Sequence, residues 1–579
     1  MVNLLTGLLR RAGRLGELIH IARMARQVAS QARPAPDRST DRSRQSLRPV
    51  IFFNASTRLS GLSQNAAFSL LTSWAVRLAG APVIHFVCQR GMSRCLLGTD
   101  ESDPSRPMPC GMCVRQSRAN YTGAQARYFT YQRDEALAAA LEDLSLDELL
   151  RYQHPLNTEN WSLDTDHWSL NTDLWSLVTD HLPLGALVLP SLRWRLRLQT
   201  LSDDEPTRFL CREFILSAWN VAREFNILME TVKPQAAVLF NGMHFPEATA
   251  FWLCQQRGVR AVTHESGFQP FSGYFVEGQA TMYPIVIPDV ELTPEQNARL
   301  DADLQKRVQG DFSMAGVKFW NEMRGLPEEL ARQAAAFKQV TAVFTNVIFD
   351  TTQLHANAVF TNMFDWLDAL LEVFRAHPET LFVLRAHPDE ARPGKASRES
   401  VAMWFEQSGA AALPNLVFIP PQEHISSYEL IRRSKFVLIY NSTIGLEATL
   451  LGVPVLGAAR APFTDYDTIY FEPERESYLR RLDAFLTADS LKATGRLEAS
   501  SRGESRGISE EAVTRTRRFM YYRYYRFSLP FGAFIEFSLP TGYVRLKKFS
   551  WRDLFPEKSP TLRALLDGLF HGKRFELDV

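Results

Sequence analysis

The sequence has no long apolar run and few cysteines. No stretch approaches the roughly 18 uninterrupted apolar residues that a membrane span needs, and the short apolar run from Val2 to Leu9 has no basic region before it. We therefore expect neither a spanning helix nor a signal peptide. Six cysteines in 579 residues are too few for the disulfide framework of a secreted protein. These absences predict a cytoplasmic protein.

The chain also has no overall excess of charge of either sign. Its 65 basic and 64 acidic residues give a formal net charge of +1, so the whole chain has no preference for nucleic acid. The content of 45% hydrophobic and 22% charged residues is that of an ordinary globular protein. Because 579 residues exceed what one hydrophobic core holds, we expect two main domains with extensions.

Basic charge is concentrated at the N-terminus. Residues 1–48 contain ten arginines and three acidic residues, a local net charge of +7. Leucines and isoleucines alternate with the arginines between Leu4 and Arg26 at spacings that fit an amphipathic helix. Such a helix either lies on an anionic membrane surface, which would place the protein on the inner face of the cell membrane, or docks on its own protein and leads into a linker over 31–48.

The body of the chain alternates between strand and helix patterns. From Pro49 the pattern predicts a strand over 50–54, a helix over 64–78 and a strand over 83–88, and a similar alternation returns over 208–264. A second series starts near Phe337 with strands that are apolar on every face, as in a parallel sheet covered by helices on both sides. The fold class is therefore α/β with two Rossmann-like domains, over 49–325 and 326–510, and a C-terminal extension over 511–579 that packs back across them.

Three segments interrupt this pattern. A tandem Trp-Ser-Leu heptad over 161–180 is either an insertion without chemistry or an acceptor-side flap that uses Trp161, Trp168 and Trp175. Residues 493–507 are rich in Gly, Ser, Arg and Glu, a composition typical of a mobile loop. Residues 515–527 mix arginines with tyrosines, which either bind single-stranded nucleic acid or pack between domains with their charged tips in water. We expect packing.

Polar motifs follow two strands of the second series. Arg385 and His387 come directly after a predicted strand, at the end where parallel sheets bind ligands, and offer a guanidinium and an imidazole to a phosphate. The alternative is that His387 only caps its loop. The turn from Asn441 through Ser442, Thr443 and Gly445 to Glu447 would begin a helix whose N-terminus attracts anions. Glu447 would accept hydrogen bonds from ribose, whereas a plain capping box would explain the hydroxyls alone.

These motifs resemble a known family. The resemblance rests on Phe344-Thr345-Asn346-Val347 with Asp350, Arg385-Ala386-His387-Pro388-Asp389-Glu390, Ser426-Ser427-Tyr428 and Tyr440-Asn441-Ser442-Thr443-Ile444-Gly445-Leu446-Glu447. Over about 340–456 the chain is similar to the capsule polysaccharide biosynthesis glycosyltransferases, which are themselves similar to bacterial Kdo transferases and sialyltransferases of GT-B fold.

The resemblance implies a function and roles for residues. It implies transfer of a sugar from a nucleotide-sugar donor, with a CMP-sugar favoured over a UDP- or GDP-sugar, to a surface polysaccharide or glycolipid acceptor. His387, Ser442 and Thr443 would contact the donor phosphate, with Arg385 and Glu447 nearby. Enzymes of this fold need no bound metal for transfer, which is compatible with the lack of a clear Asp-x-Asp motif in the donor domain.

The catalytic base is expected in the first domain. Thr263-His264-Glu265-Ser266-Gly267 follows a predicted strand and would face the same cleft, and related sialyltransferases carry two acidic residues and a glycine at a similar place. Here the first acid is His264, so the base is either His264 or Glu265, unless His264 is purely structural. Asn241-Gly242-Met243-His244 adds a second polar loop to this rim.

Four of the six cysteines form a cluster, Cys88-x6-Cys95-x14-Cys110-Gly-Met-Cys113. This spacing predicts a structural zinc site, with an iron–sulfur cluster as the second choice and four free thiols as the alternative without metal. Cys211 and Cys254 lie in predicted helices and are expected in the core.

Two other classes of function are compatible with these patterns. A sugar-nucleotide epimerase or a polyol-phosphate transferase of the same shape would share the phosphate-binding loops. A zinc-containing nucleic-acid-binding protein would use the cysteines and the basic aromatic segment, but the near-neutral charge and the two Rossmann-like series argue against it. We therefore expect no nucleic-acid partner.

Overall fold

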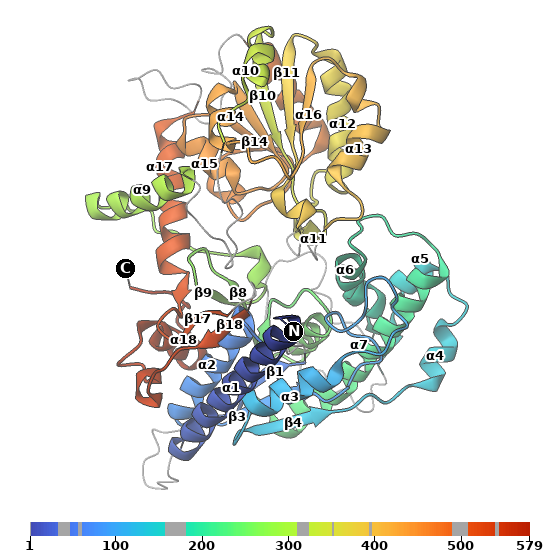
Figure 1. Cartoon of the computed structure of the whole chain (residues 1–579), viewed down its shortest axis with the longest axis vertical. Coiled ribbons are helices and arrows are strands. Elements are labelled where there is room, and N and C mark those ends of the chain that lie inside the picture. The colour runs from blue at the N-terminus through green and yellow to red at the C-terminus, as the bar shows by residue number, and fades with distance from the viewer. Residues whose placement is uncertain are drawn as a thin grey trace.

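The computed structural model describes residues 2–32, 47–55, 61–156, 181–309, 324–349, 353–392, 396–488, 508–538 and 543–578. The Trp-Ser-Leu heptads, Asp350 and residues 493–507 lie outside these ranges. Within them, no helix combines the length and apolar character that crossing a membrane requires. The main body consists of two helix-covered sheets, one above the other in Figure 1.

The first sheet has the strand order β16-β9-β8-β7-β1-β3-β4. Neighbouring strands from β8 to β4 pair in parallel, whereas β9 and β16 are antiparallel additions at one edge. The strands are β1 Val50–Asn54, β3 Val83–Cys88, β4 Gln125–Phe129, β7 Ala236–Phe240, β8 Arg260–Ser266, β9 Ser272–Glu277 and β16 Leu529–Pro530. The predicted bounds of the first two parallel strands, β1 and β3, are thus confirmed.

Helices cover both faces of this sheet, and α2 has the bounds that the apolar pattern predicted. It begins after Ser63, whose hydroxyl accepts a hydrogen bond from the amide of Ala66 at 3.1 Å. The helices are α2 Gln64–Leu78, α3 Cys110–Asn120, α4 Glu135–Leu141, α5 Leu146–Leu150, α6 Leu184–Leu196, α7 Glu205–Val232 and α8 Glu247–Gln256. The strands β5 His154–Pro155 and β6 His181–Leu182 form a two-stranded sheet, and β2 Leu62–Ser63 pairs with β18 (Tyr543–Leu546) of the C-terminal segment.

The second sheet is entirely parallel, in the order β12-β11-β10-β13-β14-β15. Its strands are β10 Gln339–Phe344, β11 Thr380–Arg385, β12 Leu416–Ile419, β13 Phe436–Ile439, β14 Val455–Gly457 and β15 Tyr470–Phe471. Its helices are α10 Glu328–Ala335, α11 Gln353–Ala356, α12 Met363–Ala376, α13 Val401–Gln407, α14 Ser427–Arg433, α15 Ile444–Leu450 and α16 Arg475–Thr487. Every residue of β11 and β13 is buried, as expected for strands covered on both faces. The predicted α/β fold with two Rossmann-like sheets is confirmed.

The C-terminal segment contacts both sheets. Helix α17 (Glu510–Tyr521) packs on α15 and on α9 (Pro294–Val308), and it continues into a π-helical turn, Tyr522–Arg526. The chain then adds β16 to the first sheet and ends in β17 (Ile535–Ser538), β18 (Tyr543–Leu546) and α18 (Pro560–His571), which packs on α2.

The basic aromatic segment over 515–527 is part of this packing. Its tyrosines are at most 8% exposed, at Tyr521, Tyr522, Tyr524 and Tyr525. Bases of a nucleic acid have no access to stack on rings buried to this degree. The packing interpretation of this segment therefore agrees with the structure.

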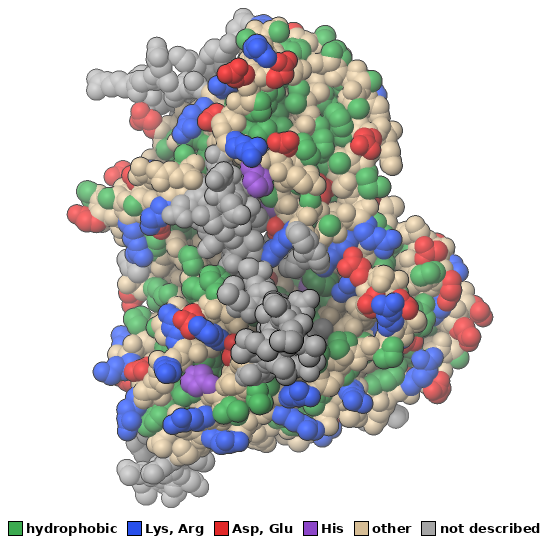
Figure 2. Space-filling model, viewed as in Figure 1, with side chains coloured by type: hydrophobic (Ala, Val, Ile, Leu, Met, Phe, Trp, Pro, Cys, Tyr) green, Lys and Arg blue, Asp and Glu red, His purple; other side chains and the backbone are tan. Residues whose placement is uncertain are grey.

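The N-terminal helix α1 (Val2–Gln31) docks on the protein with its second half. Ile21, Met24, Ala25 and Val28 are buried in the core that α2 and α18 share. Nearer the middle of the helix, Leu15 and Ile19 stay exposed. Lys and Arg side chains are frequent on the lower part of the face in Figure 2, where α1 and α3 lie.

Candidate functional site

The loops that carry the predicted donor motifs meet at one edge of the second sheet. In the parallel register Phe344 of β10 lies opposite both Arg385 of β11 and Ile439 of β13, so the three strands end side by side. Open parallel sheets bind their ligands at this carboxyl edge. The placement of both motifs at such an edge is therefore confirmed.

This edge faces the corresponding edge of the first sheet. His355 in α11, just after β10, contacts Met243 in the loop after β7, with 3.2 Å between Nε2 and Sδ. In Figure 1, α11 lies between the lower ends of the second-sheet strands and the first domain. The loop after β7 thus contacts α11, which follows the donor-side strand β10.

The hydroxyls of Ser442 and Thr443 do not cap the helix that follows them. Thr443 is the first residue before α15 and has helical backbone angles, and its side chain makes no capping hydrogen bond. Both side chains are half-buried. The next residue but one, Gly445, lets α15 approach the sheet, because a Cβ there would lie 2.6 Å from Cδ1 of Ile439. The capping-box alternative is therefore wrong, and these hydroxyls keep their hydrogen-bonding capacity for a ligand.

His387 both caps a turn and offers a donor. Its Nδ1 accepts a hydrogen bond from the amide of Asp389 at 3.1 Å, at the start of the 3₁₀ turn Pro388–Ala391. Because Nδ1 accepts, the hydrogen of the neutral ring is on Nε2. The capping role and a donor role toward a phosphate are thus compatible, since they use different nitrogens.

Arg385 serves mainly to hold a neighbouring loop. Its side chain is 4% exposed and donates hydrogen bonds to the carbonyls of Ile425 and Glu423, which follow β12. Burial lowers the pKa of this guanidinium to about 10, so it stays charged at neutral pH. A positioning role fits this geometry better than the direct phosphate contact that the sequence suggested.

Asn441 shapes the turn from within. It is 9% exposed, its amide donates to Oδ1 of Asn346 at 3.4 Å, and its own Oδ1 accepts from Gln353 at 3.5 Å. These contacts join the loop after β13 to the loop after β10. Asn441 therefore fixes the backbone that presents Ser442.

Glu447 belongs to a buried ion pair. Its two carboxylate oxygens accept hydrogen bonds from Nε of Arg307 at 3.2 Å and from the hydroxyl of Tyr428 at 2.6 Å. Burial lowers the pKa of Arg307, but the fields of Tyr524 and Glu447 outweigh this and raise it. The carboxylate links α9 to α15, so the expected contact with ribose is not favoured. The pairing of Glu447 with Arg307 was not predicted, because no local pattern pairs residues 140 positions apart; Tyr428 was noted only as part of the resemblance.

Glu265 is the best-placed carboxylate at the edge of the first sheet. Its oxygens accept hydrogen bonds from the side chains of Asn65 at 3.2 Å and Asn241 at 3.0 Å, and from the amide of Ser266 at 2.8 Å. The side chain is partly exposed at the end of β8. Three neutral donors hold the carboxylate in one orientation, as a base that receives a proton from a substrate must be held.

His264 lies deeper in the same strand. It is 1% exposed and stacks on Phe275 with 5.0 Å between ring centroids. Burial lowers the pKa of the imidazole to about 3, so the ring is neutral at physiological pH and a weak base. Nδ1 has no hydrogen-bond partner among the described residues. Of the two predicted candidates, Glu265 has the geometry and exposure of a base.

A pocket lined by both polar and apolar side chains opens beside these residues at the carboxyl edge of the first sheet. His264 and Asn65 line it, together with Asn54 after β1, and His244 and Glu247 after β7. Glu247 is 2% exposed in the first turn of α8. The sequence pattern did not predict Glu247 as a site residue. Like Glu265, however, it lies near the carboxyl end of a strand of the first sheet. The pocket gives the site a wall of hydrogen-bonding groups suited to sugar hydroxyls.

The four clustered cysteines line one cavity, with Met92 and Met108 beside them. All four are free thiols, and among the described residues no group of three or more His, Cys, Asp or Glu is placed to hold a metal ion. Burial raises the pKa of Cys95 to about 11 and that of Cys113 to about 12, whereas a metal binds thiolates. The described residues therefore do not support the predicted zinc or iron–sulfur site.

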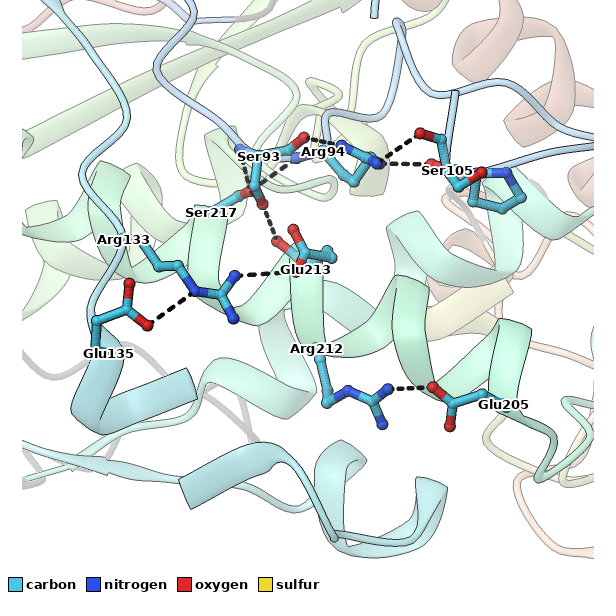
Figure 3. Close-up of polar contacts among 10 residues, drawn as sticks. Ser93, Arg94, Ser105, Arg133, Glu135, Glu205, Arg212, Glu213 and Ser217 are labelled. Carbon is cyan, nitrogen blue, oxygen red and sulfur yellow. Dashed lines mark hydrogen bonds and ion pairs between the residues drawn. The ribbon is translucent and has the colours of Figure 1, made fainter. Parts of the chain in front are cut away.

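The loop that carries these cysteines is tied to α7 by polar contacts (Figure 3). The hydroxyl of Ser217 on α7 accepts hydrogen bonds from the amides of Ser93 at 3.1 Å and Arg94 at 3.3 Å. The Arg94 guanidinium in turn donates to the carbonyls of Pro104 and Ser105. The loop therefore has a fixed path without a metal ion.

Two facing parallel α/β sheets, with phosphate-type loops at the edge of the second, define the GT-B class of fold. Residues 317–465 match the family described as capsule polysaccharide biosynthesis protein. This segment contains the motifs on which the resemblance was based, and the resemblance is thereby confirmed. No curated protein matches the chain.

Solved structures with similar folds include two Kdo transferases and several epimerases. The β-Kdo 2,4-transferase KpsC of Thermosulfurimonas dismutans is 12% identical with a TM-score of 0.31, over 54% of this chain and 84% of that chain. The β-Kdo 2,7-transferase KpsC of the same organism is 12% identical with a TM-score of 0.30. The match covers 61% of this chain and 90% of that chain. The UDP-GlcNAc 2-epimerase of Neisseria meningitidis, bound to UDP-GlcNAc, is 10% identical with a TM-score of 0.23, over 82% and 99%.

Proposed function

We propose that this protein is a glycosyltransferase that moves a sugar from a nucleotide-sugar donor to a capsule-like polysaccharide or glycolipid acceptor. The observation that carries the proposal is the pair of hydroxyls on Ser442 and Thr443, which are not used for capping and lie at the carboxyl edge of the second sheet. The family match of residues 317–465 supports a role in capsule polysaccharide synthesis.

The proposed reaction is a displacement at the anomeric carbon of the donor. Glu265 takes the proton from an acceptor hydroxyl as its oxygen bonds to that carbon, and the bond from the carbon to the donor phosphate breaks. The hydroxyls of Ser442 and Thr443 and the Nε2 hydrogen of His387 donate to the departing phosphate, which spreads its developing charge. Asn65 and Asn241 hold the base in position.

Alternative functions use parts of the same arrangement. An epimerase or a polyol-phosphate transferase would need the phosphate loops but would give a different product. A nucleic-acid-binding role is disfavoured by the burial of the tyrosines between Tyr521 and Tyr525. The transferase is preferred because it also gives a role to the held carboxylate of Glu265.

Donor binding tests this proposal. In a thermal-shift screen of CMP, UDP, GDP and their sugars, we expect one nucleotide class to stabilise the protein, by about 2.7 kcal/mol at a hundred times its Kd. The double variant Ser442→Ala/Thr443→Ala, and separately His387→Ala, should lose this stabilisation because they lack the phosphate donors. Ser477→Ala on α16 is the matched control and should keep it. The proposal fails if no nucleotide stabilises the wild-type protein.

We also propose that the exposed face of α1 around Leu15 and Ile19 attaches the enzyme to the cytoplasmic face of the membrane. Leu15 and Ile19 are 58% and 60% exposed, lie one turn apart, and are flanked by the exposed Arg14, Arg23 and Arg26.

Co-sedimentation with vesicles containing anionic lipid tests this attachment. We expect the full-length variant Leu15→Glu/Ile19→Glu to sediment several-fold less than the wild type, because it loses buried apolar area and adds negative charge. Leu47→Glu, at another exposed leucine, is the control. Equal sedimentation of wild type and double variant would discard the idea.

A further inference from the structure

Arg523 is a buried cation with no carboxylate partner among the described residues. It lies in the π-helical turn Tyr522–Arg526 and is 4% exposed. Its Nε has no hydrogen-bond partner, and the guanidinium forms no ion pair with any described residue. Single π-helical turns often occur at functional sites. A charge buried in this way is costly unless something neutralises it.

The neighbouring arginines of the same segment are all paired. Each forms an ion pair of 3.0 Å or less with a carboxylate, in the pairs Arg515–Glu511, Arg517–Asp301, Arg518–Asp289 and Arg526–Glu576. The lack of a carboxylate partner at Arg523 is therefore not a general property of this segment.

Aromatic rings lie close to the guanidinium on more than one side. Its Cζ lies 3.4 Å from the ring centroid of Phe268, 5.2 Å from that of Tyr283 and 5.5 Å from that of Phe519. Rings cover the flat face of a guanidinium, whereas its N–H groups point outward in the plane, where they fit an oxyanion with two hydrogen bonds. Burial lowers the pKa of Arg523 to about 10, so the group is still charged at neutral pH.

The position of Arg523 connects the two halves of the proposed site. Phe268 lies on the loop after β8, three residues beyond Glu265. On the other side, the charge of Arg307 acts on Arg523, and Arg307 binds Glu447 in the first turn of α15. Arg523 thus lies between the loop of the candidate base and the helix that follows Ser442 and Thr443.

We propose that Arg523 binds the phosphate of the donor nucleotide at the junction of the two sheets. This inference rests on the proposed function and adds a phosphate-binding residue outside the segment that matches the family. The phosphate supplies the negative charge that every other arginine of this segment obtains from a carboxylate.

Nucleotide binding by Arg523→Met tests the proposal. We expect wild-type protein to bind CMP, UDP or GDP, and Arg523→Met to bind the same nucleotide about ten- to a hundredfold more weakly, the usual effect of losing a hydrogen bond between charged groups. Binding of the corresponding nucleoside should not change, because it has no phosphate. The Tm of the unliganded variant should not fall, because the substitution removes an uncompensated buried charge.

Two further variants make the outcome decisive. Arg526→Met, which removes a paired arginine of the same turn, should lower Tm but keep nucleotide affinity. Arg523→Lys keeps the positive charge but lacks the planar guanidinium that donates two parallel hydrogen bonds, so it should weaken nucleotide binding several-fold. It replaces Arg523→Met if that variant does not fold.

Three results would separate the possible failures. Equal nucleotide affinity of wild type and Arg523→Met would overturn the inference alone. An effect on a donor with a carboxylate-bearing sugar, but not on its free nucleotide, would also overturn the phosphate assignment. If the wild type binds no nucleotide, the proposed function fails with it.

Discussion

Glu265→Gln is expected to lower the rate constant of sugar transfer by about a hundred- to ten-thousandfold, the range that a general base contributes. The amide cannot accept the acceptor proton, but it matches the carboxylate in size and can still accept a hydrogen bond from Asn65 or Asn241. The measurement is kcat with the donor class that the binding screen identifies, together with Tm to confirm that the variant folds. Donor affinity should change little, because Glu265 is not one of the proposed phosphate contacts.

His264→Gln is the matched control for this prediction. The imidazole is buried and its pKa is lowered to about 3, so we expect its replacement to cost less than tenfold in kcat, in keeping with a weak base that holds little of the proton in the transition state. If His264→Gln abolished transfer while Glu265→Gln retained it, the assignment of the base would be reversed.

Arg307→Met should destabilise the protein strongly. Arg307 and Glu447 form a pair whose side chains are 10% and 8% exposed, and removal of one partner leaves a buried carboxylate without its cation. Such a change typically costs about 3–5 kcal/mol. The free energy of unfolding from urea titration measures it.

The double variant Arg307→Met/Glu447→Gln shows how much of the lost stability comes from the unpaired charge of Glu447. It should recover most of the loss, because a neutral amide at position 447 can still accept from Tyr428 and leaves no unpaired charge. Lys306→Met, at a neighbouring exposed ion pair, should change stability by less than about 1 kcal/mol. No recovery in the double variant would show that Arg307 acts through contacts other than Glu447.

The sequence was most informative where one local pattern determines one element. The apolar period of 64–78 and the Ser63 cap are local signals that together define the bounds of α2. In the same way, the apolar runs of β11 and β13 define strands that are covered on both faces. Because parallel strands align their carboxyl ends, the positions of His387, Ser442 and Glu265 at sheet edges followed from the strand assignments.

Contacts between distant segments could not be predicted in this way. The roles of Glu447 and Arg385 changed because their partners, Arg307 and the carbonyl of Ile425, lie 140 and 40 residues away. The cysteine spacing correctly brought four thiols to one cavity, but the described residues contain no group placed to hold a metal ion. The missing carboxylate partner of Arg523 is a property of the packed protein only.

Product analysis is the most direct test of the central claim. Wild-type protein incubated with its nucleotide-sugar and a capsule-type oligosaccharide should release one nucleotide for each sugar added to the acceptor, measured by mass spectrometry. Glu265→Gln should bind the donor and release almost none. An epimerised nucleotide-sugar, with no sugar added to any acceptor, would contradict the account.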